Sequence, residues 1–332
     1  MSEGPPGSGR ASEPDQPFEH QPVMVDEVVD LFRPVPPGPI VDATVGGGGH
    51  ARALLEAHPH IHLVGLDRDA DALAAAERAL RPFPGRVALR HATFDRITDV
   101  CEELGLGLVS GVLFDLGVSS PQLDRADRGF SYGGDGPLDM RMDRSQSRTA
   151  ADVVNGYSEE ELARVLHSLG DERHSRRIAR AVVAARPLRS TGELADVIRA
   201  AIPAPARRRG GHPARRSFQA IRIEVNRELD LLPGALDAAV DRLAPGGRAV
   251  VLAYHSGEDR IVKARFAEAA TGACVCPPGL PCVCGAQARV RLLRRGVRPG
   301  PAEVEANHRA ESARLRAVEK LPDAPLARGS RR

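Results

Sequence analysis

The feature that most constrains this chain is a glycine-rich turn between two apolar segments of strand length. The first segment begins at Pro39 and ends at four glycines, residues 46–49. A helix-like stretch over residues 51–57 follows, and the second apolar segment, residues 63–66, ends at Asp67. This order predicts the first half of a nucleotide-binding βαβ unit.

The glycine turn also matches a ligand-binding template. Gly46, Gly48 and Ala51 fit the loose pattern G-x-G-x-x-G/A, and Asp67 lies about 20 residues further on, as that pattern expects. Glycine lets the backbone adopt positive φ and approach a ligand closely, and an acid at the strand tip can accept hydrogen bonds from both ribose hydroxyls. NAD, a flavin and S-adenosylmethionine (SAM) all carry such a ribose, so the pattern leaves the ligand's identity open.

Length and charge set outer bounds. A chain of 332 residues has room for one large domain plus an insertion or a second small domain. No apolar run approaches about 18 residues, and the first residues lack an apolar signal segment, so we expect a cytoplasmic protein that does not cross a membrane. The polar composition of residues 1–17 and 322–332 predicts disordered tails. A net charge of only +2 gives no global case for nucleic acid, so only clustered arginines count.

Two further strands end in side chains that suit a ligand. Residues 86–91 lead to Phe94, and the apolar run from Val109 ends at Asp115. Ligands of doubly wound sheets bind beyond the carboxyl ends of the strands, so we expect Asp67, Phe94 and Asp115 to converge on one crevice. Core packing of Phe94 and helix capping by Asp115 are the alternatives.

The strand pattern stops after about Asp124. A turn-rich loop over residues 128–143 carries Phe130 and Tyr132, and three stretches with helical periodicity follow it. We therefore expect a small helical domain, residues 125–213, inserted into a sheet domain made of residues 18–124 and 214–321. The insert ends in a cluster of arginines that could hold phosphates or form a solvated loop: Arg207, Arg208, Arg209, Arg215 and Arg216.

The second half of the sheet domain follows. Residues 217–232 and 234–243 predict two helices, and residues 249–256 predict a fifth strand that ends at Tyr254 and His255. These two side chains could face a substrate, although His255 could instead cap the next helix. Residues 289–295 and 313–319 predict the closing strands.

Four of the five cysteines lie around a proline-rich turn: Cys274, Cys276, Cys282 and Cys284. A reducing compartment argues against disulfides, and four thiolates suit a tetrahedral zinc ion. The C-x-C spacing is shorter than the usual C-x₂₋₄-C, so free thiols remain the alternative. Any zinc here would be structural.

Several strings together closely resemble the bacterial 16S rRNA cytosine-N4 methyltransferase family (RsmH/MraW type). They are residues 46–50, 115–124 and 136–143, and His255-Ser256 with Glu258-Asp259-Arg260. The likeness runs from about His20 to Arg316. It implies a class I SAM-dependent methyltransferase, that is, a Rossmann-like doubly wound α/β sheet with an inserted helical domain. It further implies SAM as donor and cytosine 1402 in the decoding region of 16S rRNA as acceptor.

The resemblance also implies site residues. The family's SAM contacts fall on Gly49, His50, Ala51, Asp67, Phe94, Asp115 and Gln122. Two strings depart from the family: Tyr254 and Gly257 stand where it usually has Phe and Leu, and residues 307–311 differ in sequence.

The chemistry needs an acceptor for the N4–H of cytosine. Asp115 is our candidate, and a carbonyl or hydroxyl within residues 116–120 is the alternative. Asp115 could also serve SAM alone. Phe130, Tyr132 and Tyr254 are candidates for stacking on the RNA base, with the arginine cluster on its phosphates.

Two other functions stay open. A nicotinamide-dependent oxidoreductase would share the glycine turn and Asp67, and a non-catalytic ribosome assembly factor would bind RNA without methyl transfer. The sequence leaves the oligomeric state unknown, with a homodimer as one option.

Overall fold

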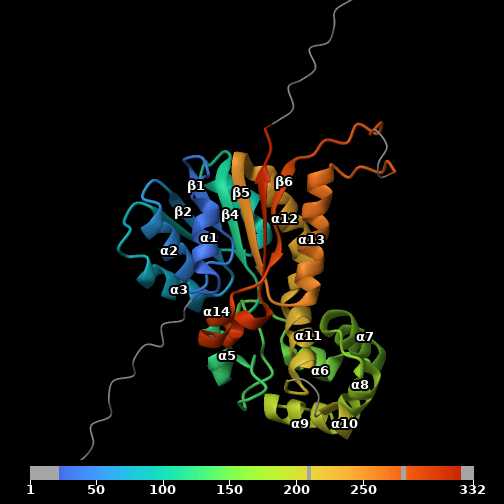
Figure 1. The fold of residues 1–332 in the computed structure, drawn as a ribbon. Helices are drawn as coiled ribbons and strands as arrows, with labels where there is room; N and C mark the ends of the chain where they lie inside the picture. Colours follow the sequence, from blue (N-terminus) through green and yellow to red (C-terminus); the bar gives the residue numbers. More distant parts are fainter. Residues whose placement is uncertain (1–21, 208–210, 278–281, 323–332) are drawn as a thin grey trace, which may run out of the picture.

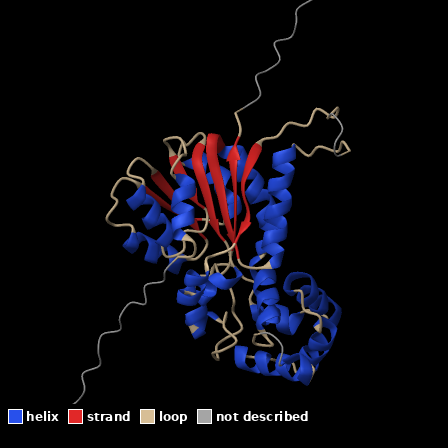
Figure 2. Cartoon of the chain, viewed as in Figure 1, coloured by secondary structure: helices blue, strands red, loops and turns tan. Residues whose placement is uncertain are grey.

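The computed structural model describes residues 22–207, 211–277 and 282–322. Within these ranges a seven-stranded sheet lies at the centre, with helices on both faces and a helical unit beyond one end (Figure 1, Figure 2). The strands are β1 (Pro39–Asp42), β2 (His62–Asp67), β3 (Val87–His91), β4 (Val109–Asp115), β5 (Leu243–Ala253), β6 (Val290–Val297) and β7 (Arg314–Lys320). Their order is β3-β2-β1-β4-β5-β7-β6, and β7 runs in the direction opposite to the other six strands. The predicted doubly wound α/β fold is confirmed.

The helices divide into two groups. The sheet is accompanied by α1 (Val25–Phe32), α2 (Gly49–Ala57), α3 (Ala70–Ala79), α4 (Ile97–Glu103), α12 (Glu228–Arg242), α13 (Ser256–Thr271) and α14 (Pro301–Ala306), with short turns η1 (Phe94–Arg96) and η3 (His308–Ser312). Between β4 and α12 come α5 (Ser120–Asp124), η2 (Ala126–Arg128), α6 (Ala150–Gly156), α7 (Glu159–Gly170), α8 (Ser175–Ala184), α9 (Thr191–Ala201), α10 (Ala204–Arg207) and α11 (Arg215–Asn226). Among the described helices, none combines the length and apolar character that a membrane span requires.

Alternating side chains on the inner strands build a core on each face of the sheet. Ile40 and Leu113 pack with α1 and α2, whereas Val41 and Phe114 pack with α4, α12 and α13. Side chains of a strand point alternately to its two faces, so these apolar runs are buried on both sides. The carboxyl ends of the parallel strands therefore remain the edge at which a ligand can reach the sheet.

The helical unit has its own core. The turn-rich loop supplies Phe130, Leu138, Met140 and Met142, which are buried among α6, α7, α8, α9 and α11. Helix α11 belongs to this core through Phe218 and its neighbours. We therefore place the end of the packed unit at Asn226, beyond the expected boundary at 213.

One expected helix is broken. The apolar pattern of residues 217–232 predicts a single helix, but Arg227 adopts a left-handed conformation (φ 51°, ψ 37°) and its N–H donates to Ile223 O. This conformation ends α11, and α12 begins at Glu228 and continues through Pro233. The predicted start of the second helix at 234 is therefore wrong.

The break predicts a stabilising substitution. A side chain at positive φ costs free energy that glycine avoids, so Arg227→Gly should raise the free energy of unfolding by about 0.5–1 kcal/mol. Arg227→Ala keeps the penalty and is the matched control. Urea titration of both variants measures the effect, and equal stabilities of the Gly and Ala variants would contradict it.

Candidate active site

A cleft of about 1120 Å³ lies along the carboxyl ends of the parallel strands, between the sheet and the helical unit. Asp67, Phe94 and Asp115 all line it, so their predicted convergence is confirmed. Other expected site residues that line it are Gly49, His50, Gln122, Arg215, Tyr254 and His255. Ala51 does not line the cleft, because this residue of α2 points its side chain into the core, where it is fully buried.

The glycine turn and Asp67 form one rigid unit. The carboxylate of Asp67 accepts the N–H of Gly46 through Oδ2 and that of Asp69 through Oδ1, both at 2.9 Å. Gly46 and Gly48 have positive φ, and a Cβ at Gly47 would meet nothing within 4 Å. Burial raises the pKa of Asp67, although both backbone donors oppose this shift. The tip of β2 thus presents a fixed acceptor beside open space.

Asp115, at the end of β4, is held by two side chains from other segments. Its Oδ1 accepts the phenol O–H of Tyr254 at 2.7 Å, and its Oδ2 lies 3.4 Å from Nδ1 of His50. Nε2 of His50 lies 2.8 Å from Val23 O, which can only accept, so this nitrogen carries a proton. Burial lowers the pKa of His50, but Asp115 outweighs it and the net pKa is raised.

The same cluster includes a second, more deeply buried acid. Asp42 is 1 % exposed, and burial raises its pKa to about 7, with the charge of His50 opposing. Burial and the charge of Asp115 raise the pKa of Tyr254 well above its ordinary value, so its phenol remains a donor. Neither Asp42 nor the contact between Tyr254 and Asp115 was predicted. An acid inside the apolar run of β1 was the available signal for Asp42.

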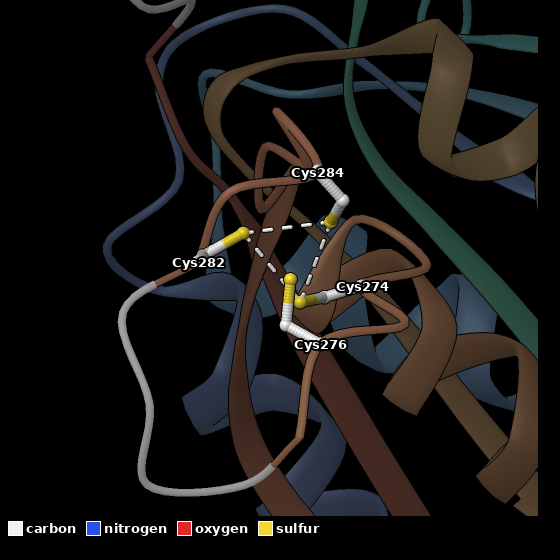
Figure 3. A group of neighbouring side chains, drawn as sticks. All are labelled: Cys274, Cys276, Cys282 and Cys284. Carbon is white, nitrogen blue, oxygen red and sulfur yellow. Dashed lines mark hydrogen bonds between the residues drawn. The ribbon is translucent and has the colours of Figure 1, made fainter.

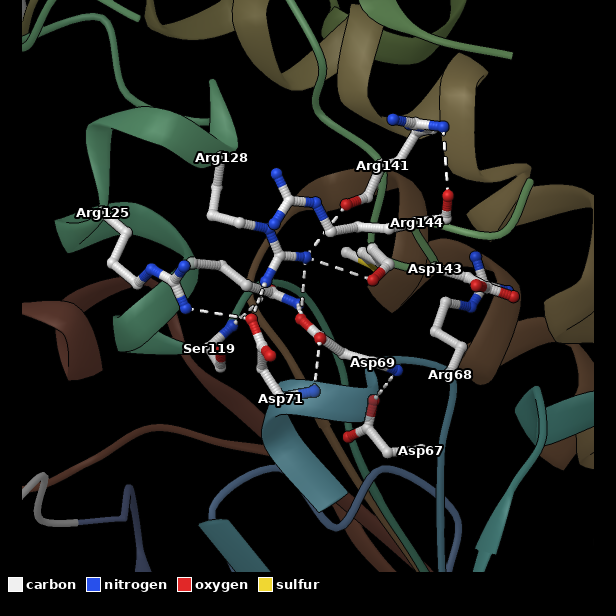
Figure 4. Close-up of polar contacts among 12 residues, drawn as sticks. Asp67, Arg68, Asp69, Asp71, Ser119, Arg125, Arg128, Arg141, Asp143 and Arg144 are labelled. Atoms are coloured by element: carbon white, nitrogen blue, oxygen red, sulfur yellow. Dashed lines mark hydrogen bonds and ion pairs between the residues drawn. The ribbon is translucent and has the colours of Figure 1, made fainter. Parts of the chain in front are cut away.

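Gln122 holds the loop after β4 in place. Its Nε2 donates to Asp69 Oδ2 at 2.7 Å, and its Oε1 accepts the N–H of Ser119 at 3.0 Å. The guanidinium of Arg128 lies 2.9 Å from the same oxygen of Asp69, and Figure 4 shows Arg128 directed at both Asp69 and Asp71. The amide of Gln122 therefore already has protein partners on both sides.

Two other predicted residues show their structural roles. The Phe94 ring meets Phe114 edge-on at 6.2 Å and remains partly exposed to the cleft. His255 caps α13, because its Nδ1 accepts the N–H of Gly257 at 3.2 Å and its Nε2 lies 3.1 Å from Glu258 Oε1. Nδ1 is thus engaged as the helix cap, whereas Nε2 is buried beside the Glu258 carboxylate without a hydrogen bond among the described residues.

The expected base-stacking and phosphate contacts fall in different places. Tyr132 lies outside the cleft lining, and its ring stacks on that of His212 with the ring centres 4.4 Å apart. Phe130 is buried in the helical unit, so the stacking role expected for Phe130 is wrong. Arg207 is exposed at the end of α10 and does not line the cleft. Arg208 and Arg209 lie outside the described residues.

The cleft also contains cations that the sequence analysis missed. Arg260 and Lys263 come from the first turns of α13, and three arginines come from the C-terminal segment: Arg298, Arg309 and Arg314. The motif at residues 258–260 was the sequence signal that could have indicated Arg260 and Lys263.

Comparison with known proteins decides the family. Residues 17–321 match the model of the MraW methylase family. The chain belongs to the MraW methylase family. Two curated relatives are each named ribosomal RNA small subunit methyltransferase H. The one from Thermobifida fusca is 55% identical over 309 residues, covering 91% of this chain and 93% of the relative. The one from Symbiobacterium thermophilum is 52% identical over 310 residues, covering 92% and 97%.

The cleft of this MraW family member fits SAM, the methyl donor of its class. The glycine turn leaves open space at Gly47, Asp67 offers an oriented acceptor, and Ser120 Oγ is buried with no partner among the described residues. We expect Asp67 to bind the ribose hydroxyls and Phe94 to contact the adenine. SAM supplies a methyl group made electrophilic by its sulfonium.

The buried carboxyl of Asp42 predicts a pH-dependent stability. Its pKa is raised by folding, so the native state loses stability as pH rises from 3.8 to about 7, and the loss is constant above that. Asp42→Asn should exceed wild type in free energy of unfolding by about 1–3 kcal/mol at pH 8. The difference should fade towards pH 4, as measured by denaturant titration across pH. Asp196→Asn, on the exposed face of α9, is the control, and a pH-independent gap would refute the argument.

Proposed function

We propose that this protein transfers a methyl group from SAM to the exocyclic N4 of a cytosine in small-subunit rRNA, which the family resemblance identifies as cytosine 1402. The names of the relatives support the substrate class. The observation that carries the proposal is a single cleft lined both by Asp115, at the end of β4, and by cations without ion-pair partners, which we call the rim.

Asp115 suits the acceptor role. The N4 amine of cytosine is a poor nucleophile because its lone pair is delocalised into the ring, so the site must accept a hydrogen bond from N4–H and direct the lone pair at the methyl group. The Asp115 side chain is 29% exposed, and each carboxylate oxygen can accept more than one hydrogen bond. Tyr254 and His50 occupy one position on each oxygen, which leaves acceptor capacity for substrate.

Tyr254 and His50 act as positioning residues in this proposal. They contact different oxygens of Asp115 and so restrict rotation of its carboxylate. The phenol of Tyr254 donates to one oxygen, and the ring of His50 lies beside the other. The carboxylate is therefore oriented before substrate arrives, and this orientation is a main source of rate in such reactions.

The rim suits a polyanion. Five cations that line the cleft have neither a carboxylate within ion-pair distance nor a side-chain hydrogen bond in the part of the chain that is described: Arg215, Arg260, Lys263, Arg298 and Arg314. Arg68 and Arg216 also line it without an ion pair, but each donates to a backbone carbonyl. Neighbouring Arg222 and Arg316, by contrast, are paired with Glu228 and Asp259. Phosphates bound at the rim would offset the cost of taking the cytosine out of its stack.

Two alternatives are weaker. Membership of a methylase family argues against a nicotinamide-dependent oxidoreductase. A non-catalytic assembly factor would need no oriented acceptor at the strand tip.

The direct test uses tritiated SAM and small ribosomal subunits from a strain that lacks this gene. We expect label in 16S rRNA that nucleoside analysis identifies as N4-methylcytidine. Binding of the subunits without transfer of label would favour the assembly factor instead.

The acceptor role predicts a split between kcat and donor binding. Asp115→Asn keeps one carbonyl oxygen but removes the negative charge, so kcat should fall by about 100-fold while the Kd for SAM changes by less than about threefold. Asp99→Asn, at an exposed carboxyl on α4, is the control. Loss of SAM affinity at unchanged kcat would assign Asp115 to the donor alone.

The rim predicts a salt-dependent effect. Replacing Arg215, Arg260 and Lys263 by Gln should weaken RNA binding and lower the slope of log affinity against log salt by about 0.7 for each lost phosphate contact. SAM affinity should not change. The exposed residues Arg78 and Arg81, away from the cleft, provide the control substitutions. Filter binding across salt concentrations measures the slope, and identical slopes for both sets would rule out the rim as the phosphate site.

A further inference from the structure

A second cluster of chemically active side chains lies far from the cleft. Between α13 and β6 the chain extends away from the sheet, at the end of the molecule opposite the helical unit (Figure 1). Cys274 and Cys276 lie on the outgoing arm, and Cys282 and Cys284 lie on the returning arm. Figure 3 shows the four sulfur atoms directed towards a common centre.

The sulfur atoms have the spacing of a metal site. The Sγ atoms of Cys274 and Cys282 are 3.5 Å apart, those of Cys282 and Cys284 are 3.5 Å apart, and those of Cys274 and Cys284 are 3.6 Å apart. All four lie within 4.8 Å of one another. With Zn–S bonds of about 2.3 Å, a tetrahedral site has S···S edges of about 3.8 Å. Three of the distances thus approximate one face of that tetrahedron.

The local backbone explains how the short C-x-C spacing can work. In each arm a single residue separates the two cysteines, and Cys276 and Cys284 lie at bends of the backbone. The intervening Val275 and Val283 are 86% and 88% exposed, so they face solvent while the neighbouring thiols face one another. Each arm therefore directs both of its thiols inward. The Val283 N–H also donates to Cys276 Sγ at 3.4 Å, which is the kind of outer contact that supports a thiolate ligand.

We propose that Cys274, Cys276, Cys282 and Cys284 bind one zinc ion in a structural site. On binding, the four thiols release their protons to solvent and form four Zn–S bonds. All four are free thiols in the structure. An iron–sulfur cluster distributes its thiolates over several iron atoms, whereas these sulfurs surround one point.

The position of the site makes its role structural. Helix α13 has 16 residues and is therefore about 24 Å long, and it separates the cluster from His255 at the cleft. The two exposed valines show that these arms do not fold around an apolar centre of their own. Zinc would join the arms and fix the path into β6, which is an edge strand of the sheet.

The test measures metal in the full-length protein, purified without chelators. Elemental mass spectrometry should find about one zinc per chain. Cys282→Ser and Cys284→Ser should lower this content and speed proteolytic cleavage between α13 and β6. Val283→Ser, in the same arm, and Cys101→Ala, at the buried fifth cysteine, should retain zinc.

A second measurement protects the test against unfolded variants. Wild-type protein exchanged with cobalt should show the visible and near-ultraviolet absorption of a tetrahedral tetrathiolate. One equivalent of iron in place of zinc, disulfides found by mass spectrometry, or four metal-free thiols would each overturn the proposal.

Discussion

The buried ion pair between Arg128 and Asp69 joins the helical unit to the sheet. Their side chains are only 2% and 5% exposed, so both charges have lost most of their water. Such a pair is stable only when its remaining hydrogen-bonding groups are also satisfied. Here they are, because Arg128 donates to the carbonyls of Arg141 and Met142, and Asp69 accepts the amide of Gln122. The geometry of the post-β4 loop therefore depends on one fully connected polar network.

The same short segment anchors both crossings of the chain between the two units. Asp69 holds the outgoing crossing through Arg128, and Arg68 donates to the backbone O of Asn226 at the returning crossing. Asn226 in turn bonds to the backbone of Met140 and Met142 in the turn-rich loop. Because Asp67 directly precedes these two anchors, the ligand-facing tip of β2 and the placement of the insert are fixed by three consecutive residues.

The sequence predicts those parts of the molecule that depend on local pattern. The sheet, the glycine turn and the strand-tip residues follow from alternation and spacing, which are properties of neighbouring residues. The contact of Asp115 with His50 and Tyr254 joins three distant segments, and no local pattern encodes it. The break at Arg227 depends on one backbone conformation. The cluster of arginines near 207 does not reveal the direction of α10. The cations that line the cleft come from other segments, and only the folded structure identifies them.

Charge is distributed along the cleft in a way that would orient a nucleic acid. Asp67 and Asp115 place carboxylates at the strand tips, whereas unpaired arginine and lysine side chains gather at the rim. Phosphates would be attracted to the rim and repelled by the two carboxylates, whereas a neutral base with an N–H donor could approach them. The two carboxylates also differ in their partners: backbone N–H groups hold Asp67, whereas the ionisable side chains of His50 and Tyr254 hold Asp115. The acceptor that we assign to the substrate is thus the one held by side chains from two distant segments, whereas Asp67 is held by the backbone of its own turn.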